Sequence, residues 1–348
     1  MRTSEPRPRA LEGLSAEERA AVRRVVAAAR FELIPLPSAL ERAEELPPGA
    51  PVTVTASPSR GIEATLELAA ELAARGHPAT PHLSARLIRD GAHLAELLAR
   101  CREAGLREAF VVGGDGDRPG GFADGLALLR AVHELGSPFE RIGVPGYPEG
   151  HPGIPPAALR TALLAKAPLA HWVTTQMCFD PNALAAWIAD VRAAGVGLEV
   201  HLGVPGVTDL VRLLSISARI GLASSARYLR KNRSLLGRIA RGRFGPDGLL
   251  EALAATLADP RAGVGALHVF TFNQVAPTIA WRARVLGGAR GLRSGGSRRG
   301  ARAVPGPPAS RAPQRDAHLA TSWYRSAPLE ARHGLRGTRW GWGDGGRG

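Results

Sequence analysis

The sequence predicts an α/β protein whose fold is a (β/α)8 TIM barrel, and three observations support this. Eight short β-rich runs alternate with longer amphipathic stretches through residues 30–289. Consecutive runs mostly begin 20 to 35 residues apart, which is the length of one βα unit. No GxGxxG motif follows the first run, so a doubly wound open sheet is the less favoured alternative.

The predicted strands are short runs rich in β-branched and apolar residues. They cover residues 31–35, 52–56, 79–83, 109–114, 141–146, 172–177, 198–203 and 266–271. Between them, apolar residues recur at three- and four-residue spacing, which is the period of an amphipathic helix. These predicted helices cover residues 61–75, 91–104, 123–135, 156–165 and 181–194.

Further helices are expected at both ends of this pattern and inside one gap. Ser15 and Glu18 form a capping-box pattern at the start of residues 15–26. Residues 276–286 provide the closing helix. The long gap between the seventh and eighth strands is expected to hold extra helices, over residues 210–220, 226–241 and 247–258.

The net charge of +14 is concentrated at the carboxyl end of the chain. Residues 287–348 contain twelve Arg against three acidic residues, a net charge of +9, which leaves +5 for the other 286 residues. This composition, rich in Gly and without apolar periodicity, is typical of a disordered basic tail. We therefore expect an N-terminal extension with a helix over residues 1–29, the barrel over 30–289 and the tail over 290–348. Contact of the tail with nucleic acid is a less favoured alternative.

Composition also excludes several classes of protein. Cys101 and Cys178 are the only cysteines, too few for a disulfide framework or a multi-cysteine zinc site. No apolar run approaches the roughly 18 residues that span a membrane, and the amino end lacks the apolar stretch of a secretory signal. We expect a cytoplasmic protein without membrane contact. We also expect no metal, because His82 and His151 have no third ligand at a matching strand end.

Polar side chains stand at the ends of six consecutive predicted strands, and active sites of such barrels lie at the carboxyl ends of the strands. In chain order they are Glu32, Thr55, His82, Asp115, Tyr147 with His151, and Gln176. Glu32 is the sharpest candidate, because apolar residues surround it in FELIP and desolvation raises the pKa of a carboxyl toward general-acid use. The alternative is a structural Glu held in an ion pair at the barrel end.

The segment VVGGDGD, residues 111–117, has the glycines of an anion-binding loop. Asp115 and Asp117 would repel a phosphate, however, so the segment suits hydrogen-bond recognition of a heterocycle or a sugar better. An ordinary turn rich in Gly and Asp is the alternative.

Seven segments, in order, make the chain from Phe31 to about Leu286 resemble the methylenetetrahydrofolate reductase family, whose fold is a flavin-carrying (β/α)8 barrel. They are FELIPLP (31–37), VTVTASP (52–58), PHLS (81–84), GGDGD (113–117), GYPEGHP (146–152), TQMCFD (175–180) and LHVFTFNQ (267–274). The resemblance implies an oxidoreductase of one-carbon and methionine metabolism. Such an enzyme uses NADH or NADPH, through FAD, to reduce 5,10-methylenetetrahydrofolate to 5-methyltetrahydrofolate. A homo-oligomer is expected as well.

The resemblance also implies roles for individual residues. Glu32 matches the donor of a proton to the folate nitrogen, and Asp115 matches the aspartate that stabilises the resulting iminium cation beside the flavin. Flavin contacts are matched by Thr55, His82, Gly114, Asp115, Phe122, Ala123, Tyr147, His151 and, with a one-residue shift, Lys166. Folate contacts are matched by Gln176, Phe270 and Gln274.

The chain departs from the family's pattern at several positions. Gly113 stands where an Arg is frequent, and no carboxylate occurs between His151 and Lys166. FTFNQ replaces the more usual YTLNR, so Phe270 lacks a hydroxyl group and Gln274 lacks a charge. Two alternatives stay open: a folate- or flavin-binding barrel with lost or altered catalysis, and a folate-linked oxidoreductase of one-carbon catabolism. These residues distinguish neither NADH from NADPH nor the direction of flux.

Overall fold

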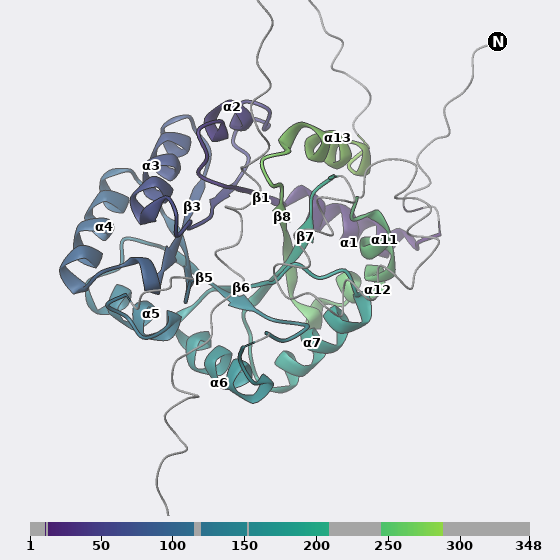
Figure 1. Ribbon diagram of the computed structural model, residues 1–348. Coiled ribbons are helices and arrows are strands. Elements are labelled where there is room, and N and C mark those ends of the chain that lie inside the picture. Colours follow the sequence, from purple (N-terminus) through teal and green to yellow (C-terminus); the bar gives the residue numbers. More distant parts are fainter. Residues whose placement is uncertain (1–10, 12, 115–119, 152, 209–244, 288–348) are drawn as a thin grey trace, which may run out of the picture.

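The computed structural model describes residues 11, 13–114, 120–151, 153–208 and 245–287, and within them eight parallel strands close into one barrel in chain order (Figure 1). The strands are β1 (Arg30–Leu33), β2 (Val52–Val54), β3 (Ala79–Ser84), β4 (Glu108–Val112), β5 (Arg141–Gly146), β6 (Trp172–Thr175), β7 (Glu199–Pro205) and β8 (Val264–Phe270). Each predicted strand overlaps its observed counterpart, so the prediction of a (β/α)8 barrel is confirmed.

Helices form a ring outside the strands (Figure 1). The described helices are α1 (Ala16–Ala27), α2 (Ala39–Ala43), α3 (Gly61–Ala74), α4 (Gly91–Glu103), α5 (Gly125–Glu134), α6 (Pro156–Lys166), α7 (Pro181–Ala193), α11 (Asp247–Ala252), α12 (Ala254–Ala258) and α13 (Val275–Val285). Residues 247–258 form two helices where one was predicted, and they confirm that extra helices separate β7 from β8. The helices predicted at 210–220 and 226–241 lie outside the described residues.

The pairing of β1 with β8 closes the barrel across most of the chain length. Glu32 of β1 is aligned with Thr53 of β2 on one side and with Phe270 of β8 on the other. Because alternate residues of a strand share a face, Arg30 and Glu32 of β1 point into the interior together with His268 and Phe270 of β8. Closure of the barrel therefore places interior residues of the first strand, β1, beside interior residues of the last strand, β8.

A cluster of charged residues fills the interior at the amino ends of the strands. Arg30 donates hydrogen bonds to Glu108, and Arg141 donates one of 3.2 Å to Glu199. The guanidinium groups of Arg30 and Arg141 lie 5.4 and 5.3 Å from the ring centroid of Trp172. These pairs satisfy the charges at this end of the barrel, which leaves the carboxyl ends of the strands for chemistry.

Helix α1 packs against the last strand and the helices beside it. Ser15 and Glu18 form the predicted capping box at its start. Val22 and Val25 are fully buried, and Arg24 donates hydrogen bonds to the carbonyl oxygens of Leu257 and Val264. The helix thus contributes to the same core as the barrel.

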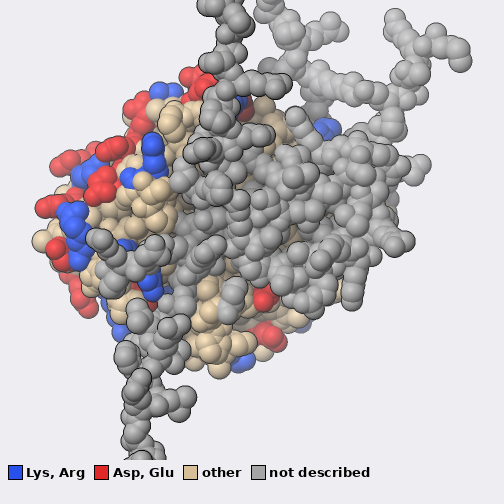
Figure 2. Space-filling model, in the orientation of Figure 1, with Lys and Arg blue, Asp and Glu red and all other residues tan. Residues whose placement is uncertain are grey.

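The charged residues visible over α3 and α4 are mixed in sign (Figure 2). Arg75 pairs with Glu71 on α3, and Arg100 of α4 pairs with Glu67 of α3. This part of the surface is therefore not a basic patch. No helix among the described residues is long and apolar enough to cross a membrane.

Candidate active site

Glu32 and His268 form a hydrogen-bonded pair inside the barrel. Glu32 Oε2 lies 3.1 Å from His268 Nε2, and both side chains are at most 5% exposed. Burial raises the pKa of the Glu32 carboxyl above its usual 4.5, and the interaction with His268 opposes part of that rise. The predicted desolvation of Glu32 is therefore observed, and so is a specific partner. A carboxyl in this setting keeps its proton to a higher pH than an exposed carboxyl does, which suits a general acid.

His82 lies beside this pair and is fully buried. Its ring centroid is 4.9 Å from that of Phe110 and 6.3 Å from that of His268. Burial lowers the pKa of His82 well below its usual 6.5, and the nearby His268 lowers it further. His82 therefore stays neutral at physiological pH and packs as a polar aromatic ring against its neighbours.

The segment after β8 fixes the backbone of β1. The Thr271 hydroxyl donates to the Glu32 carbonyl oxygen, and the Asn273 side chain pairs with both the N–H and the C=O of Ile34, at 2.9 and 3.1 Å. Phe272 and Asn273 have φ angles of 51° and 57°, in the left-handed region that Asn tolerates and Phe rarely adopts. This turn holds Glu32 from the backbone side, in addition to the side-chain contact with His268.

Among the described residues, the polar atoms buried near the carboxyl ends of the strands without a hydrogen-bond partner include the Gln176 side-chain nitrogen and the Ser84 hydroxyl. Gln176 is 2% exposed, and a buried amide donor without an acceptor costs about 1–3 kcal/mol. An acceptor from a ligand would remove that cost, so Gln176 fits a binding role.

Gly114, at the start of the glycine loop, must be glycine for two reasons. Its φ angle is +86°, and a Cβ atom there would lie 1.8 Å from the Ser84 Oγ. Asp115 follows it and lies outside the described residues, so its predicted position beside the substrate stays a prediction.

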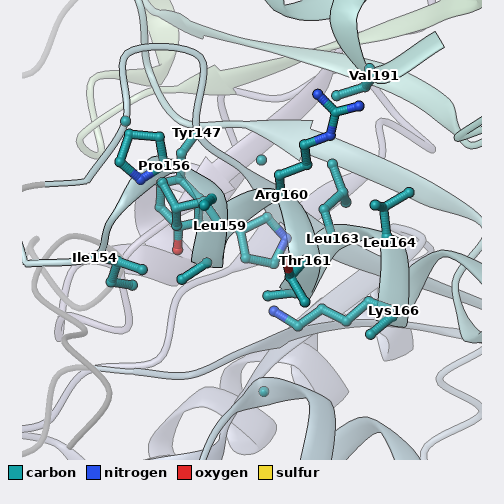
Figure 3. Close-up of a pocket in the computed structure, with 18 of the residues that line it drawn as sticks. Tyr147, Ile154, Pro156, Leu159, Arg160, Thr161, Leu163, Leu164, Lys166 and Val191 are labelled. Carbon is teal, nitrogen blue, oxygen red and sulfur yellow. The ribbon is translucent and has the colours of Figure 1, made fainter. Parts of the chain in front are cut away.

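A cavity of about 1180 Å³ opens between α6 and the carboxyl ends of β4 and β5. It exceeds the roughly 300–1,000 Å³ of ordinary small-molecule pockets. Its wall includes Gly113, Ala123, Tyr147 and Lys166, and much of the remainder is apolar surface from α6 and α7. Figure 3 shows Lys166 extending across this cavity from the end of α6, with its amino group on the side where Tyr147 lies.

The amino group of Lys166 is close to the amino end of α5. A Cβ atom on Gly125, the first residue of α5, would lie 3.6 Å from Lys166 Nζ. Asp124 caps this helix, accepting hydrogen bonds from Leu126 N and Ala127 N at 2.7 and 2.9 Å. Burial lowers the pKa of Lys166, and the Asp124 carboxylate opposes the fall. A cation beside a helix amino end is suited to hold an anion.

The other predicted residues fall into two groups. Ala123, Tyr147 and Lys166 line the cavity, and the Tyr147 ring meets His151 edge-on at 5.5 Å between centroids. The remaining residues lie elsewhere: Glu32, Thr55, His82, Gln176 and Phe270 are buried, whereas Phe122 and Gln274 are partly exposed. The cavity wall therefore holds only part of the predicted cofactor set.

Sequence reasoning missed His268 and Asp124. His268 stands within the quoted LHVF, two positions before Phe270, so strand alternation could have placed both in the interior. Asp124 is the N-cap of α5, and its charge next to Lys166 follows only from the packing of α5 against α6. Among the described residues, no group of three His, Cys, Asp or Glu side chains is arranged to hold a metal ion.

Comparison with known proteins gives one family match and several distant structures. The profile of the family described as methylenetetrahydrofolate reductase matches residues 34–223, more than half of the chain. An uncharacterized protein from Clostridium thermocellum, described as binding two copies of 5-methyl-5,6,7,8-tetrahydrofolic acid, is 9% identical with a TM-score of 0.46, over 77% of this chain and 99% of its own.

Two structures from Burkholderia cenocepacia J2315 are also similar. A putative phosphonomutase is 15% identical with a TM-score of 0.39, over 76% of this chain and 97% of its own. A putative lyase/mutase is 17% identical with a TM-score of 0.39, over 78% of this chain and 86% of its own.

Proposed function

The chain belongs to the methylenetetrahydrofolate reductase family, and from this premise we propose that it reduces 5,10-methylenetetrahydrofolate to 5-methyltetrahydrofolate with NADH or NADPH, through bound FAD. The family makes the chain a folate-metabolising oxidoreductase. The donor, the flavin and the exact reaction are the proposal. A cytoplasmic homo-oligomer in methionine and one-carbon metabolism is proposed with them.

The buried carboxyl of Glu32 is the observation that carries this proposal. Opening the five-membered methylene bridge requires a proton on a folate nitrogen, which is otherwise a poor leaving group. Burial keeps the proton on Glu32 at higher pH than an exposed carboxyl would hold it, and His268 and Thr271 hold the residue in place. Glu32 is therefore assigned as the general acid.

The cavity beside α6 fits the proposed flavin. Lys166 of α6, whose amino group lies beside the amino end of α5, would hold a phosphate, while Tyr147 and Ala123 would contact the more apolar parts of the cofactor. When bound, FAD would supply the hydride chemistry, accepting hydride from NAD(P)H and passing hydride to the folate. Gln176, with its buried and unpaired amide nitrogen, would donate a hydrogen bond to the pterin.

The remaining assignments complete the proposal. Asp115 would stabilise the iminium cation by its charge, and Thr55, His82, Gly114, Phe122 and His151 would contact the flavin. Phe270, buried with its ring edge-on to His268 at 4.8 Å, and Gln274, at the start of α13, would contact the folate. Their departure from the family's Tyr and Arg favours weaker binding of the folate's glutamate tail.

The variant Glu32→Gln should separate the two half-reactions. The amide keeps the size of the acid but cannot donate the proton, so folate reduction should fall by roughly 10²–10⁴. Reduction of the flavin by NADH needs no proton from Glu32, so NADH–menadione turnover should stay within about tenfold of the parent, a small part of a general-acid effect. Stopped-flow measurement of each half-reaction, at matched FAD content, makes the comparison.

The result also separates the proposal from its alternatives. Equal losses in both half-reactions would assign Glu32 a structural role. A parent protein that is yellow but reduces neither menadione nor folate would be a flavin-binding barrel with lost catalysis. A parent protein that oxidises 5-methyltetrahydrofolate faster than it reduces 5,10-methylenetetrahydrofolate, with both substrates at the same concentration, would belong to one-carbon catabolism.

A further inference from the structure

We propose that His268 is a positioning residue for Glu32, whose Nε2–H donates to Glu32 Oε2 so that Oε1 carries the acidic proton. This inference rests on the proposed function and names a residue that the family resemblance did not supply.

The pair is held rigidly from both of its strands. Glu32 and His268 lie on neighbouring strands that pair in register, with Arg30 opposite His268 and Glu32 opposite Phe270. The side-chain contact of 3.1 Å is inside the barrel, and both side chains are buried. The Thr271 hydroxyl holds the Glu32 carbonyl oxygen. Because the Glu32 backbone and its Oε2 atom are both held by hydrogen bonds, the direction in which Oε1 points is fixed as well.

Whether Glu32 can protonate a substrate depends on which of its two carboxyl oxygens carries the acidic proton. If the acid proton were on Oε2, it would point at His268 and away from any substrate. If Nε2–H of a neutral His268 donates to Oε2, the proton sits on Oε1 and is available for transfer. The folate nitrogen then takes the Oε1 proton while the methylene C–N bond breaks toward that nitrogen. Glu32 becomes a carboxylate that still accepts the His268 hydrogen bond, and it regains its proton from water before the next turnover.

Aromatic rings from β3, β4 and β8 lie close to the His268 imidazole. His82 of β3 is 6.3 Å away, between ring centroids, and burial lowers the pKa of His82 well below its usual range. The rings of Phe110 on β4 and Phe270 on β8 lie 6.5 and 4.8 Å from the His268 ring, between centroids. His268 also interacts electrostatically with His201 of β7 and lowers the pKa of His201.

The first test locates the ring proton of His268 by NMR and needs no measurement of enzyme activity. Long-range ¹H–¹⁵N NMR of the histidine-labelled full chain distinguishes a ring protonated at Nε2 from one protonated at Nδ1 and from the imidazolium. The His268 signal is assigned by its loss in His268→Gln. We expect a neutral ring protonated at Nε2. A ring protonated at Nδ1, or an imidazolium at pH 7, would overturn the proposal.

The second test compares two substitutions at His268 in the folate half-reaction. Gln can donate an N–H to Glu32 Oε2, whereas Leu cannot. His268→Leu should slow folate reduction by roughly 10- to 100-fold, the effect of losing a hydrogen bond to an ionisable group, and His268→Gln should recover most of that loss. The matched control is His201→Gln, since His201 is also a buried histidine with a Glu partner, at 2.7 Å from Glu199.

The outcomes distinguish this inference from the proposed function. Equal losses in His268→Leu and His268→Gln, with His201→Gln unaffected, would mean that hydrogen-bond donation at this position is irrelevant. Equal loss in all three variants would assign the effect to stability. A parent that binds the folate but does not reduce it would contradict the proposed function, whereas the NMR result would still decide where the His268 proton lies.

Discussion

The amino group of Lys166 lies in the cavity wall beside the first residue of α5, where the backbone N–H groups of a helix begin. Both the ammonium group and the helix amino end carry positive charge, and burial already lowers the pKa of Lys166. The Asp124 carboxylate offsets part of this repulsion. An anionic group between Lys166 and α5 would stabilise the arrangement further, which is the local reason to assign a phosphate contact here.

Lys166→Ala should therefore weaken flavin retention more than it weakens folding. The loss of one charged hydrogen bond, about 1.5–3 kcal/mol, corresponds to roughly a ten- to hundredfold rise in the flavin Kd. Fluorescence titration of flavin-free protein gives the Kd, and thermal unfolding gives the stability. Arg130→Ala, an exposed charge on α5 outside the cavity wall, is the control. Unchanged flavin affinity in Lys166→Ala would remove Lys166 from the site.

Glu32 was identified from the sequence, but its partner was not. The apolar residues around Glu32 in FELIP predict desolvation, which is a local property of the chain. His268 lies 236 residues away and meets Glu32 only because β8 pairs with β1. A single histidine in a strand is ambiguous until barrel closure places it, so residue patterns predicted the desolvation of Glu32 but not its hydrogen-bond partner.

At the amino ends of the strands, the buried His201 pairs with the half-exposed Glu199, and the pKa values of both residues are lowered. His201 Nε2 lies 2.7 Å from Glu199 Oε1. Burial lowers the pKa of His201 from 6.5 to about 4, although the hydrogen bond to Glu199 opposes the fall. The hydrogen bond to His201 is the largest cause of the fall in the Glu199 pKa from 4.5 to about 2. Both shifts tie the stability of the barrel to pH.

The sign of this dependence is the same for both residues. His201 stays neutral in the folded protein, so the unfolded chain takes up its proton first, and stability falls as pH drops from 6.5 to about 4. The depressed Glu199 pKa adds stability above 4.5 that is lost as pH falls toward 2. Urea unfolding at several pH values should show this decline. His201→Gln should flatten it between pH 6.5 and about 4, whereas a variant of the exposed His171 should not. An unchanged slope in His201→Gln would contradict the assignment.

Helices with strong apolar periodicity were predicted well, and the short helix α2 was not predicted. The boundaries of α3, α4 and α7 agree with the predicted helices to within one residue, because each shows several turns of apolar repetition. Helix α2 spans only Ala39–Ala43, too short for that repetition to be recognised. The turn at Phe272 and Asn273 depends on positive φ angles that nothing in the flanking pattern indicates.

At the scale of the whole molecule, the described residues include every strand pair that closes the barrel, from the first strand to the last. Strand β8 pairs with β7 and β1, and α13 ends at Val285. Arg282 of α13 donates hydrogen bonds to the carbonyl oxygens of Val26 and Ala27 at the end of α1. The first and last described helices are therefore joined to each other over β8, and no further element is needed to close the ring.

A chain that ends at residue 289 should therefore retain the fold and the activity of the full chain. Its thermal midpoint should stay within about 3 °C, which corresponds to roughly 1 kcal/mol for a domain of this size. NADH–menadione turnover and folate reduction should match those of the full chain. The matched control removes residues 1–28 instead, which deletes the buried Val22 and Val25 and the Arg24 hydrogen bonds, and we expect it to abolish folding. Loss of soluble protein in the chain ending at 289 would show that residues 290–348 belong to the folded body, and would overturn the division at residue 289.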